Sequence, residues 1–156
     1  MLPRVGLGFD VHPFSADPSR QLVLGGVTLD GPGLEGHSDA DVVAHAVADA
    51  LLGAAGLDDL GTLFPAHDPA WAGADSMVLL AQAVALVTKE HDIGNVDATI
   101  VLEAPRLAPH RAAMETGLTG CVGAPVTVKP KRAESLGALG RREGVACLAV
   151  AIVARR

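Results

Sequence analysis

Aromatic side chains are almost absent from this sequence of 156 residues: they make up 3 % of it, and there is no tyrosine. Hydrophobic residues nevertheless reach 49 %, so the chain can fold around a core of alanine, valine and leucine. Stacking rings and a basic surface are typical of nucleic-acid-binding proteins, whereas this chain has a formal net charge of −6. The composition therefore argues against a nucleic-acid partner.

Cysteines and long apolar runs are scarce as well. Cys121 and Cys147 are the only cysteines and form no C-x-x-C motif, so we interpret both as buried thiols in a reducing compartment. No apolar run approaches the roughly 18 residues of a membrane helix, and the N-terminal MLPRVGLGFD has no signal-peptide core. These absences predict a cytoplasmic protein with no membrane partner, and the length fits a single domain over residues 1–156.

The apolar pattern predicts alternating strands and helices. Strands are expected at 4–12, 95–103, 125–129 and 144–156, a hairpin at 20–30, helices at 35–56, 75–92 and 105–123, and loops at 58–74 and 130–143. Ser38 fits the N-cap of the first helix, with Asp41 completing a capping box, and Gly56 fits its end. This order predicts an α/β fold: a two-layer sandwich with helices on one face of a mixed β-sheet.

The other face of the predicted sheet has no partner within the chain. The stretch CLAVAIV in the last strand is apolar on both sides. A monomer that left this face in water would expose a large apolar patch. We infer a homo-oligomer that covers the face. The alternative is a strand buried at the centre of a monomer.

Polar residues at the end of the first strand indicate a metal site. Asp10 and His12, in GFDVHPF, lie two residues apart and so point to the same side of a strand. The first helix offers Asp41, His45 and Asp49 on one face, and His45 is the conspicuous donor among alanines and valines. One carboxylate and two imidazoles suit Zn²⁺. However, D-x-H motifs also occur by chance, and a helical histidine is often a core residue.

Two loop segments have both a functional and a structural interpretation. His37 and Ser38 precede the first helix, whose N-terminus presents free N–H groups to an anion. The alternative is that Ser38 only caps the helix while His37 lies in solvent. Asp59 and Asp68, in the 58–74 loop, could bind sugar hydroxyls or simply cap turns.

A basic run at 129–132, KPKR, precedes Glu134 and two further arginines. A carboxylate among cations can hold Mg²⁺ on phosphate oxygens while the cations meet the remaining negative charge. Such a cluster is also common in solvated loops, so composition alone does not decide between the two.

Six segments follow one another in the chain: GFDVHPF, HSDADVVAHAVADALLGAAG, DLGTLFPAHDP, GADS, GNVDATIVLEAPRLAPH and AESLGALGRREGVAC. In this order they resemble the 2-C-methyl-D-erythritol 2,4-cyclodiphosphate synthase family of the non-mevalonate isoprenoid pathway, from residue 4 to about residue 150. The resemblance implies a homotrimer with active sites between subunits. It also implies a phosphorus–oxygen lyase that converts 4-diphosphocytidyl-2-C-methyl-D-erythritol 2-phosphate to the 2,4-cyclodiphosphate and releases CMP.

The resemblance further implies the site residues. A Zn²⁺-type ion would bind Asp10, His12 and His45, and Mg²⁺ or Mn²⁺ would bind Glu134 with the substrate diphosphate. His37 and Arg132 would be catalytic. The residues expected to contact substrate are Asp10, His12, His37, Ser38, Asp59, Gly61, Phe64, Asp68, Leu102, Arg106, Leu107, Ala108, Lys131, Arg132, Glu134 and Arg141.

Four positions depart from the family pattern. Arg132 stands where a threonine is usual, Arg142 where a glycine is usual, and Ala66 and His67 replace an acid and a threonine. Two other functions therefore stay open: a zinc-dependent phosphohydrolase, and a non-catalytic trimer that binds isoprenoid diphosphates.

Overall fold

The computed structural model describes residues 2–156. In chain order its elements are β1 (Arg4–Pro13), β2 (Leu22–Leu24), β3 (Val27–Leu29), α1 (Val42–Ala55), α2 (Leu60–Leu63), η1 (Pro69–Trp71), α3 (Ser76–Val87), β4 (His91–Val101), η2 (Ala108–His110), α4 (Arg111–Val122), β5 (Val126–Lys131), α5 (Gly137–Gly140) and β6 (Gly144–Arg155). Each predicted strand and helix is present. The two predicted loops contain short helices, α2 and η1 in one and α5 in the other.

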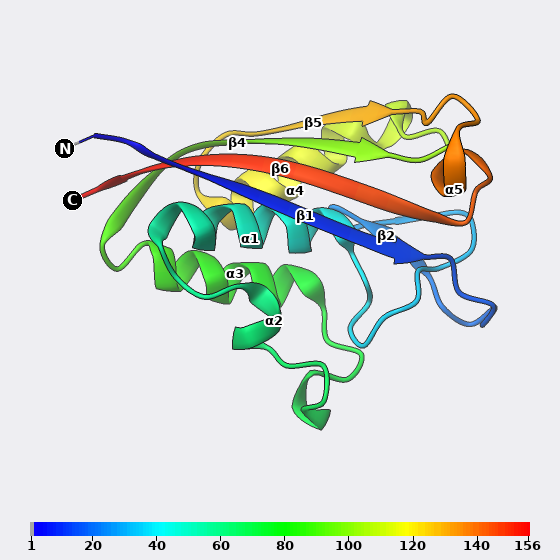
Figure 1. The fold of residues 1–156 in the computed structure, drawn as a ribbon, viewed down its shortest axis with the longest axis horizontal. Helices are drawn as coiled ribbons and strands as arrows, with labels where there is room; N and C mark the ends of the chain where they lie inside the picture. The colour runs from blue at the N-terminus through cyan, green and yellow to red at the C-terminus, as the bar shows by residue number, and fades with distance from the viewer. Residues whose placement is uncertain (1) are drawn as a thin grey trace.

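The sheet is mixed, as the sequence predicts. Its strand order is β1-β6-β4-β5, with β6 antiparallel to both neighbours and β4 parallel to β5. The helices α1 and α4 lie on one face of the sheet, and α3 packs against α1 and α4 (Figure 1). Helices on one face of a mixed sheet are therefore confirmed, and α3 adds a second tier that the two-layer prediction did not include.

The close packing of α1 on β1 depends on two glycines. A Cβ atom added at Gly6 would lie 2.0 Å from the Ala50 carbonyl oxygen, and one added at Gly8 would lie 1.9 Å from the Ala46 carbonyl oxygen. Gly6, Gly8 and Asp10 share the helix-facing side of β1 because strand side chains alternate. The close contact of β1 with α1 at Gly6 and Gly8 therefore also brings Asp10 next to the first turns of α1.

Gly8→Ala is expected to destabilise the protein by more than about 3 kcal/mol, the upper end of ordinary overpacking, because the added methyl group meets rigid helix backbone. Urea unfolding measures this loss. Gly53→Ala in α1 is the matched control: nothing lies within 4 Å of its added Cβ, so it should be neutral or slightly stabilising. Equal unfolding midpoints for the two variants would contradict the close contact.

Asp41, and not Ser38, is the N-cap of α1. Its buried carboxylate accepts N–H bonds from the first turn of the helix and from both residues of the β2–β3 turn. The capping box predicted at Ser38 is therefore wrong, because Asp41 satisfies two segments at once. The predicted end of the helix is confirmed, since Gly56 adopts φ 76°.

The cysteine prediction is correct for one residue of the two. Both thiols are free, but Cys147 is buried whereas Cys121 is only partly buried, on α4. Burial raises the pKa of Cys147 well above its ordinary value. Among residues 2–156, no helix is both long enough and apolar enough to cross a membrane.

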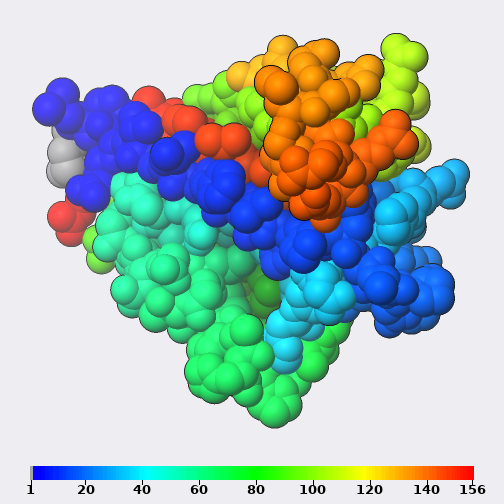
Figure 2. Space-filling model, turned by 45° about the vertical axis from the view of Figure 1, so that its right-hand side comes forward, coloured from blue at the N-terminus to red at the C-terminus, as the bar shows by residue number. Residues whose placement is uncertain are grey.

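The sheet face opposite the helices is exposed, and it is apolar along β1 and β6. Leu7 is 65 % exposed and Phe9 is 55 % exposed, although both lie in the middle of a strand. Figure 2 shows β1 as a continuous blue band across the molecular surface. The large apolar side chains exposed on this face, called the outer face below, are Val5, Leu7, Phe9, Val11, Leu148 and Val150.

Candidate functional site

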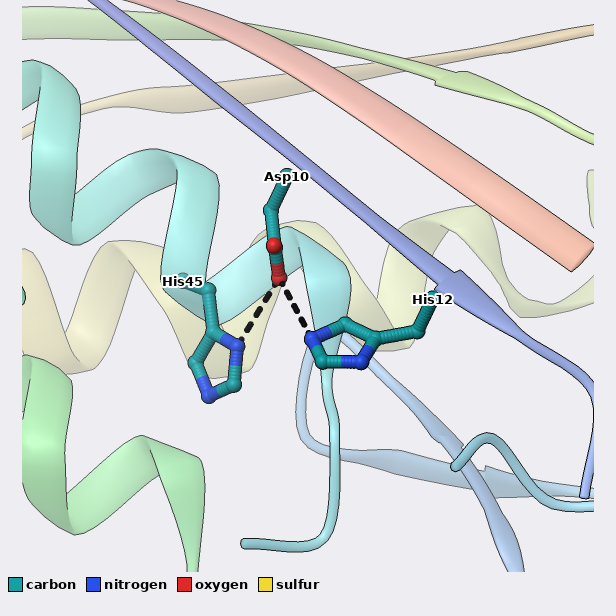
Figure 3. Close-up of side chains that lie close together, drawn as sticks. All are labelled: Asp10, His12 and His45. Atoms are coloured by element: carbon teal, nitrogen blue, oxygen red, sulfur yellow. Dashed lines mark hydrogen bonds and ion pairs between the residues drawn. The ribbon is translucent and has the colours of Figure 1, made fainter. Parts of the chain in front are cut away.

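Three predicted metal ligands meet where β1 passes α1. Asp10 and His12 project from the helix-facing side of β1, and His45 projects toward them from α1 (Figure 3). The Asp10 Oδ2 atom lies 3.1 Å from His12 Nε2 and 2.9 Å from His45 Nδ1. One ligand atom from each residue lies within 4.8 Å of the other two. The clustering predicted for these residues is confirmed.

The electrostatics of Asp10, His12 and His45 favour a positive charge, either protons or a cation, at the point between the three side chains. Burial opposes the ionisation of Asp10, but hydrogen bonds from His12 and His45 outweigh it and hold the pKa of Asp10 well below its ordinary value. The hydrogen bond to Asp10 raises the pKa of His12, although burial opposes that rise. Protons or a divalent cation can supply the charge that this carboxylate attracts.

A backbone contact fixes which nitrogen of His12 faces the cluster. His12 Nδ1 lies 2.6 Å from the Glu35 carbonyl oxygen. A carbonyl oxygen can only accept, so Nδ1 carries a proton and Nε2 is the atom available to a metal. The resulting set of one carboxylate oxygen and two imidazole nitrogens fits a divalent ion such as Zn²⁺ that keeps a position open for substrate.

A cavity of about 240 Å³ opens beside this cluster. Figure 2 shows it as the hollow between β1 in blue, the segment before α1 in cyan and the α2 region in green. Four further predicted substrate contacts line it, namely His37, Ser38, Gly61 and Phe64. The rest of the lining is Asp10, His12, His45, Asp49, Leu60, Ala66, Trp71 and Leu79.

Hydrogen bonds tie the 58–74 segment to the cavity. His37 Nε2 lies 3.0 Å from the Asp68 carbonyl oxygen, so the segment is anchored to the residues before α1. The side chain of Asp59 caps α2 and the side chain of Asp68 caps η1, and neither residue lines the cavity. Of the two interpretations given by the sequence, sugar binding or turn capping, the structure shows capping for both. His67 is exposed.

A second cavity, of about 580 Å³, lies where β4 and β5 end. Its lining includes six predicted contacts, Leu102, Arg106, Leu107, Ala108, Lys131 and Arg132, together with Glu103, Pro105, Pro130 and Arg142. Arg132 donates to Glu103 over 3.0 Å, and the Glu103 side chain is only 3 % exposed. Arg142 has φ 61°, a left-handed conformation that favours the glycine usual at this position.

Two predicted diphosphate contacts lie outside both cavities. Glu134 is exposed and has φ 53°, and Arg141 pairs with Glu143 over 2.6 Å. In the described part of a single chain, these side chains are not brought to the metal cluster. Their predicted roles remain proposals.

The two cavities lie at the same end of the sheet. His12 pairs with Val145 near the end of β1, and Val101 at the end of β4 pairs with Ala146 and Lys131. The strands β1 and β4, which both pair with β6, therefore carry the metal cluster and the basic cavity to the same end of the sheet.

Sequence reasoning missed several residues that support the site. Asp39 and Ser76 form hydrogen bonds behind His45, and Glu103 holds Arg132. Asp49 lines the metal cavity and accepts the Leu60 N–H over 2.7 Å, and burial raises the pKa of Asp49. The sequence places Asp49 on the same helix face as His45 but assigns it no role, whereas the contacts of Ser76 and Glu103 join distant segments.

Known proteins are similar to this chain over nearly all of its length. The YgbB family model matches residues 3–154. A 2-C-methyl-D-erythritol 2,4-cyclodiphosphate synthase of Bordetella petrii is 52 % identical, over 97 % of this chain and 96 % of its own. The bifunctional IspDF of Campylobacter jejuni superposes with a TM-score of 0.93 at 37 % identity, over 99 % of this chain and 43 % of its own. The IspF of Plasmodium falciparum, in a CDP complex, gives 0.85 at 31 % identity, over 99 % and 97 %.

Proposed function

The chain belongs to the YgbB family, with the 2-C-methyl-D-erythritol 2,4-cyclodiphosphate synthases, and we propose that it catalyses their reaction. The substrate is 4-diphosphocytidyl-2-C-methyl-D-erythritol 2-phosphate, and the products are the 2,4-cyclodiphosphate and CMP. The observation that carries the proposal is the convergence of Asp10, His12 and His45 beside the cavity lined by His37 and Ser38. Residues 1–156 act as one synthase domain.

The reaction is an internal phosphoryl transfer. An oxygen of the 2-phosphate attacks the β-phosphorus, and the bond from that phosphorus to the bridging oxygen breaks as CMP leaves. The nucleophile is already an anion, so the enzyme needs positioning and charge stabilisation rather than a strong base. A Zn²⁺-type ion held by Asp10, His12 and His45 would make the β-phosphorus more electrophilic.

Residues beside the metal ligands hold the methylerythritol end of the substrate. His37 and Ser38, which line the cavity beside the metal ligands, bind the 2-phosphate. Asp59 and Gly61 meet hydroxyl groups, and the loop from Phe64 to Asp68 closes over the sugar. The positions of His37, Ser38, Gly61 and Phe64 in the cavity lining support their part of this division, whereas the roles of Asp59 and Asp68 rest on the family resemblance alone.

The second cavity binds the CDP end. Leu102 to Ala108, including Arg106, receive cytidine, largely through backbone contacts and from a neighbouring subunit. Lys131, Arg132 and Arg141 meet the diphosphate. Glu134 would hold a Mg²⁺ or Mn²⁺ ion, whose charge would offset that of the substrate diphosphate. The basic lining of the cavity and its place at the end of the sheet that carries the metal cluster support this assignment.

The enzyme works as a homotrimer that covers the outer face. The exposed Leu7 and Phe9 support assembly, because a free chain would leave a continuous apolar patch in water. Neighbouring subunits then share each active site, which offers Glu134 and Arg141 a route to substrate. The two free thiols suit a reducing cytoplasm.

The deciding experiment incubates the purified protein with the substrate and Mg²⁺ and separates the products by chromatography. CMP together with the cyclic diphosphate supports the synthase. CMP with only linear phosphates would indicate a zinc-dependent phosphohydrolase. Failure to release CMP would leave the non-catalytic isoprenoid-diphosphate-binding trimer.

Arg132→Thr is expected to keep the activity within about fivefold, because a hydroxyl donor restores the usual residue and a charged and a neutral donor to phosphate differ by about 1 kcal/mol. Steady-state kinetics at saturating Mg²⁺ tests this. Arg132→Ala, which restores no donor, is the matched comparison and should be slower than Arg132→Thr. A loss of a hundredfold or more in Arg132→Thr would show that the guanidinium itself carries catalysis.

A further inference from the structure

The face of His45 turned away from Asp10 contacts a buried serine and aspartate. Ser76 is 1 % exposed, and its Oγ lies 2.8 Å from His45 Nε2. The same Oγ forms a short hydrogen bond to Asp39 Oδ1, while Asp39 Oδ2 accepts the Ser76 backbone N–H over 3.2 Å. Asp39 Oδ1 also accepts the backbone N–H of Asp41 over 3.2 Å. The serine hydroxyl is therefore held between a carboxylate and an imidazole.

The direction of these hydrogen bonds follows from the number of protons. A carboxylate can only accept, so the single hydroxyl proton of Ser76 must lie on its contact with Asp39. Ser76 Oγ can then only accept from His45, which places a proton on Nε2 of the ring. His45 Nδ1, the atom that faces Asp10, is left as the nitrogen that can bind a metal.

We propose that Asp39 and Ser76 are positioning residues for the metal, forming a relay that keeps the His45 proton on Nε2 and presents Nδ1 to the ion. The inference rests on the proposed metal site but not on the proposed reaction. Hydrogen bonds of this kind behind a histidine ligand commonly change metal affinity by about 10- to 100-fold. His12 is fixed in the same sense, but by the Glu35 backbone carbonyl, which no substitution removes.

A second hydroxyl near His45 does not have the same constraint. Ser38 Oγ lies 3.2 Å from His45 Nε2 and accepts the Ala40 N–H over 3.1 Å. No carboxylate takes its proton among the contacts of the described residues. Ser38 Oγ also lies 3.3 Å from Ser76 Oγ, and because the Ser76 proton lies on Asp39, Ser38 can only donate on that contact. The relay therefore runs through Ser76, and Ser38 remains available to substrate.

Zinc affinity of the metal-stripped protein tests the relay directly. Competition with a chromophoric chelator should give a dissociation constant about 10- to 100-fold higher for Ser76→Ala and at least about fivefold higher for Asp39→Ala. The double variant should match Ser76→Ala within about twofold, because Asp39 acts only through the serine. In zinc-loaded wild-type protein labelled with ¹⁵N-histidine, NMR should place the His45 ring proton on Nε2.

A surface pair of the same residue types is the matched control. Ser19 donates through its hydroxyl to Asp17 over 2.7 Å and touches no proposed ligand, so Ser19→Ala should leave zinc affinity unchanged. Thermal unfolding of each variant in excess chelator separates a loss of stability from a loss of affinity. Three results would each overturn the proposal. The first is a zinc affinity of Ser76→Ala within twofold of wild type, and the second is that the two single effects multiply in the double variant. The third is a His45 ring proton on Nδ1. Wild-type zinc binding without turnover would instead refute the reaction and leave the relay standing.

Discussion

His45→Ala should leave the protein without bound zinc and reduce CMP release by about a thousandfold or more. Two ligands, Asp10 and His12, would remain from a cluster of three. Lewis-acid stabilisation of a phosphoryl transition state contributes several kcal/mol, and each 1.36 kcal/mol is tenfold in rate, which gives the expected size of the loss. Metal analysis by mass spectrometry and a CMP-release assay measure both effects.

Assembly should survive this substitution, because His45 lies on the helix side of the sheet and not on the outer face. Light scattering should therefore give the same mass for His45→Ala and for the wild type. Chelator-treated wild type is the control: it should lose activity and recover it when zinc is returned, whereas the variant should not recover. A variant that kept full activity would refute the three-residue metal centre.

Leu7→Asp should convert the assembled protein into single chains of 15.8 kDa and lower the activity by about a hundredfold or more. Leu7 is 65 % exposed in the isolated chain, so a carboxylate there does not disturb the core. In an assembled outer face the same carboxylate would be buried without a partner, at a cost of several kcal/mol for each subunit. Light scattering gives the mass, and the CMP-release assay gives the activity.

Val78→Asp is the matched control for this experiment. Val78 is 52 % exposed on α3, which lies on the helix side of the molecule and away from the outer face. It should keep the assembled mass and the activity of the wild type. If Leu7→Asp retained the wild-type mass, the outer face would not be the subunit interface.

The patterns that depend on neighbouring residues could be predicted from the sequence. The strands at 4–12 and 95–103, the hairpin at 20–30 and the helix that ends at Gly56 all follow from local signals, and the structure confirms them. The metal cluster needed more than spacing, because Asp10 and His45 are 35 residues apart. The family resemblance joined them.

The errors and omissions have a common physical cause. Ser38 is as good a helix cap as Asp41 in local terms, but only Asp41 also meets the buried N–H groups of the β2–β3 turn. Likewise Ser76 is 31 residues from His45, and no local pattern distinguishes it from an ordinary residue at the start of a helix. Long-range hydrogen bonds decided both cases.

The first strand leaves almost no room for sequence drift. On one side, Gly6 and Gly8 admit no side chain and Asp10 and His12 serve the metal, while the other side forms much of the outer face. Half-buried strands usually tolerate substitutions at alternate positions, because one side faces only water. If the proposed assembly covers the outer face, both sides of β1 are in use. A substitution in β1 would then need a matching change, either in the backbone of α1 or in the surface of the neighbouring subunit.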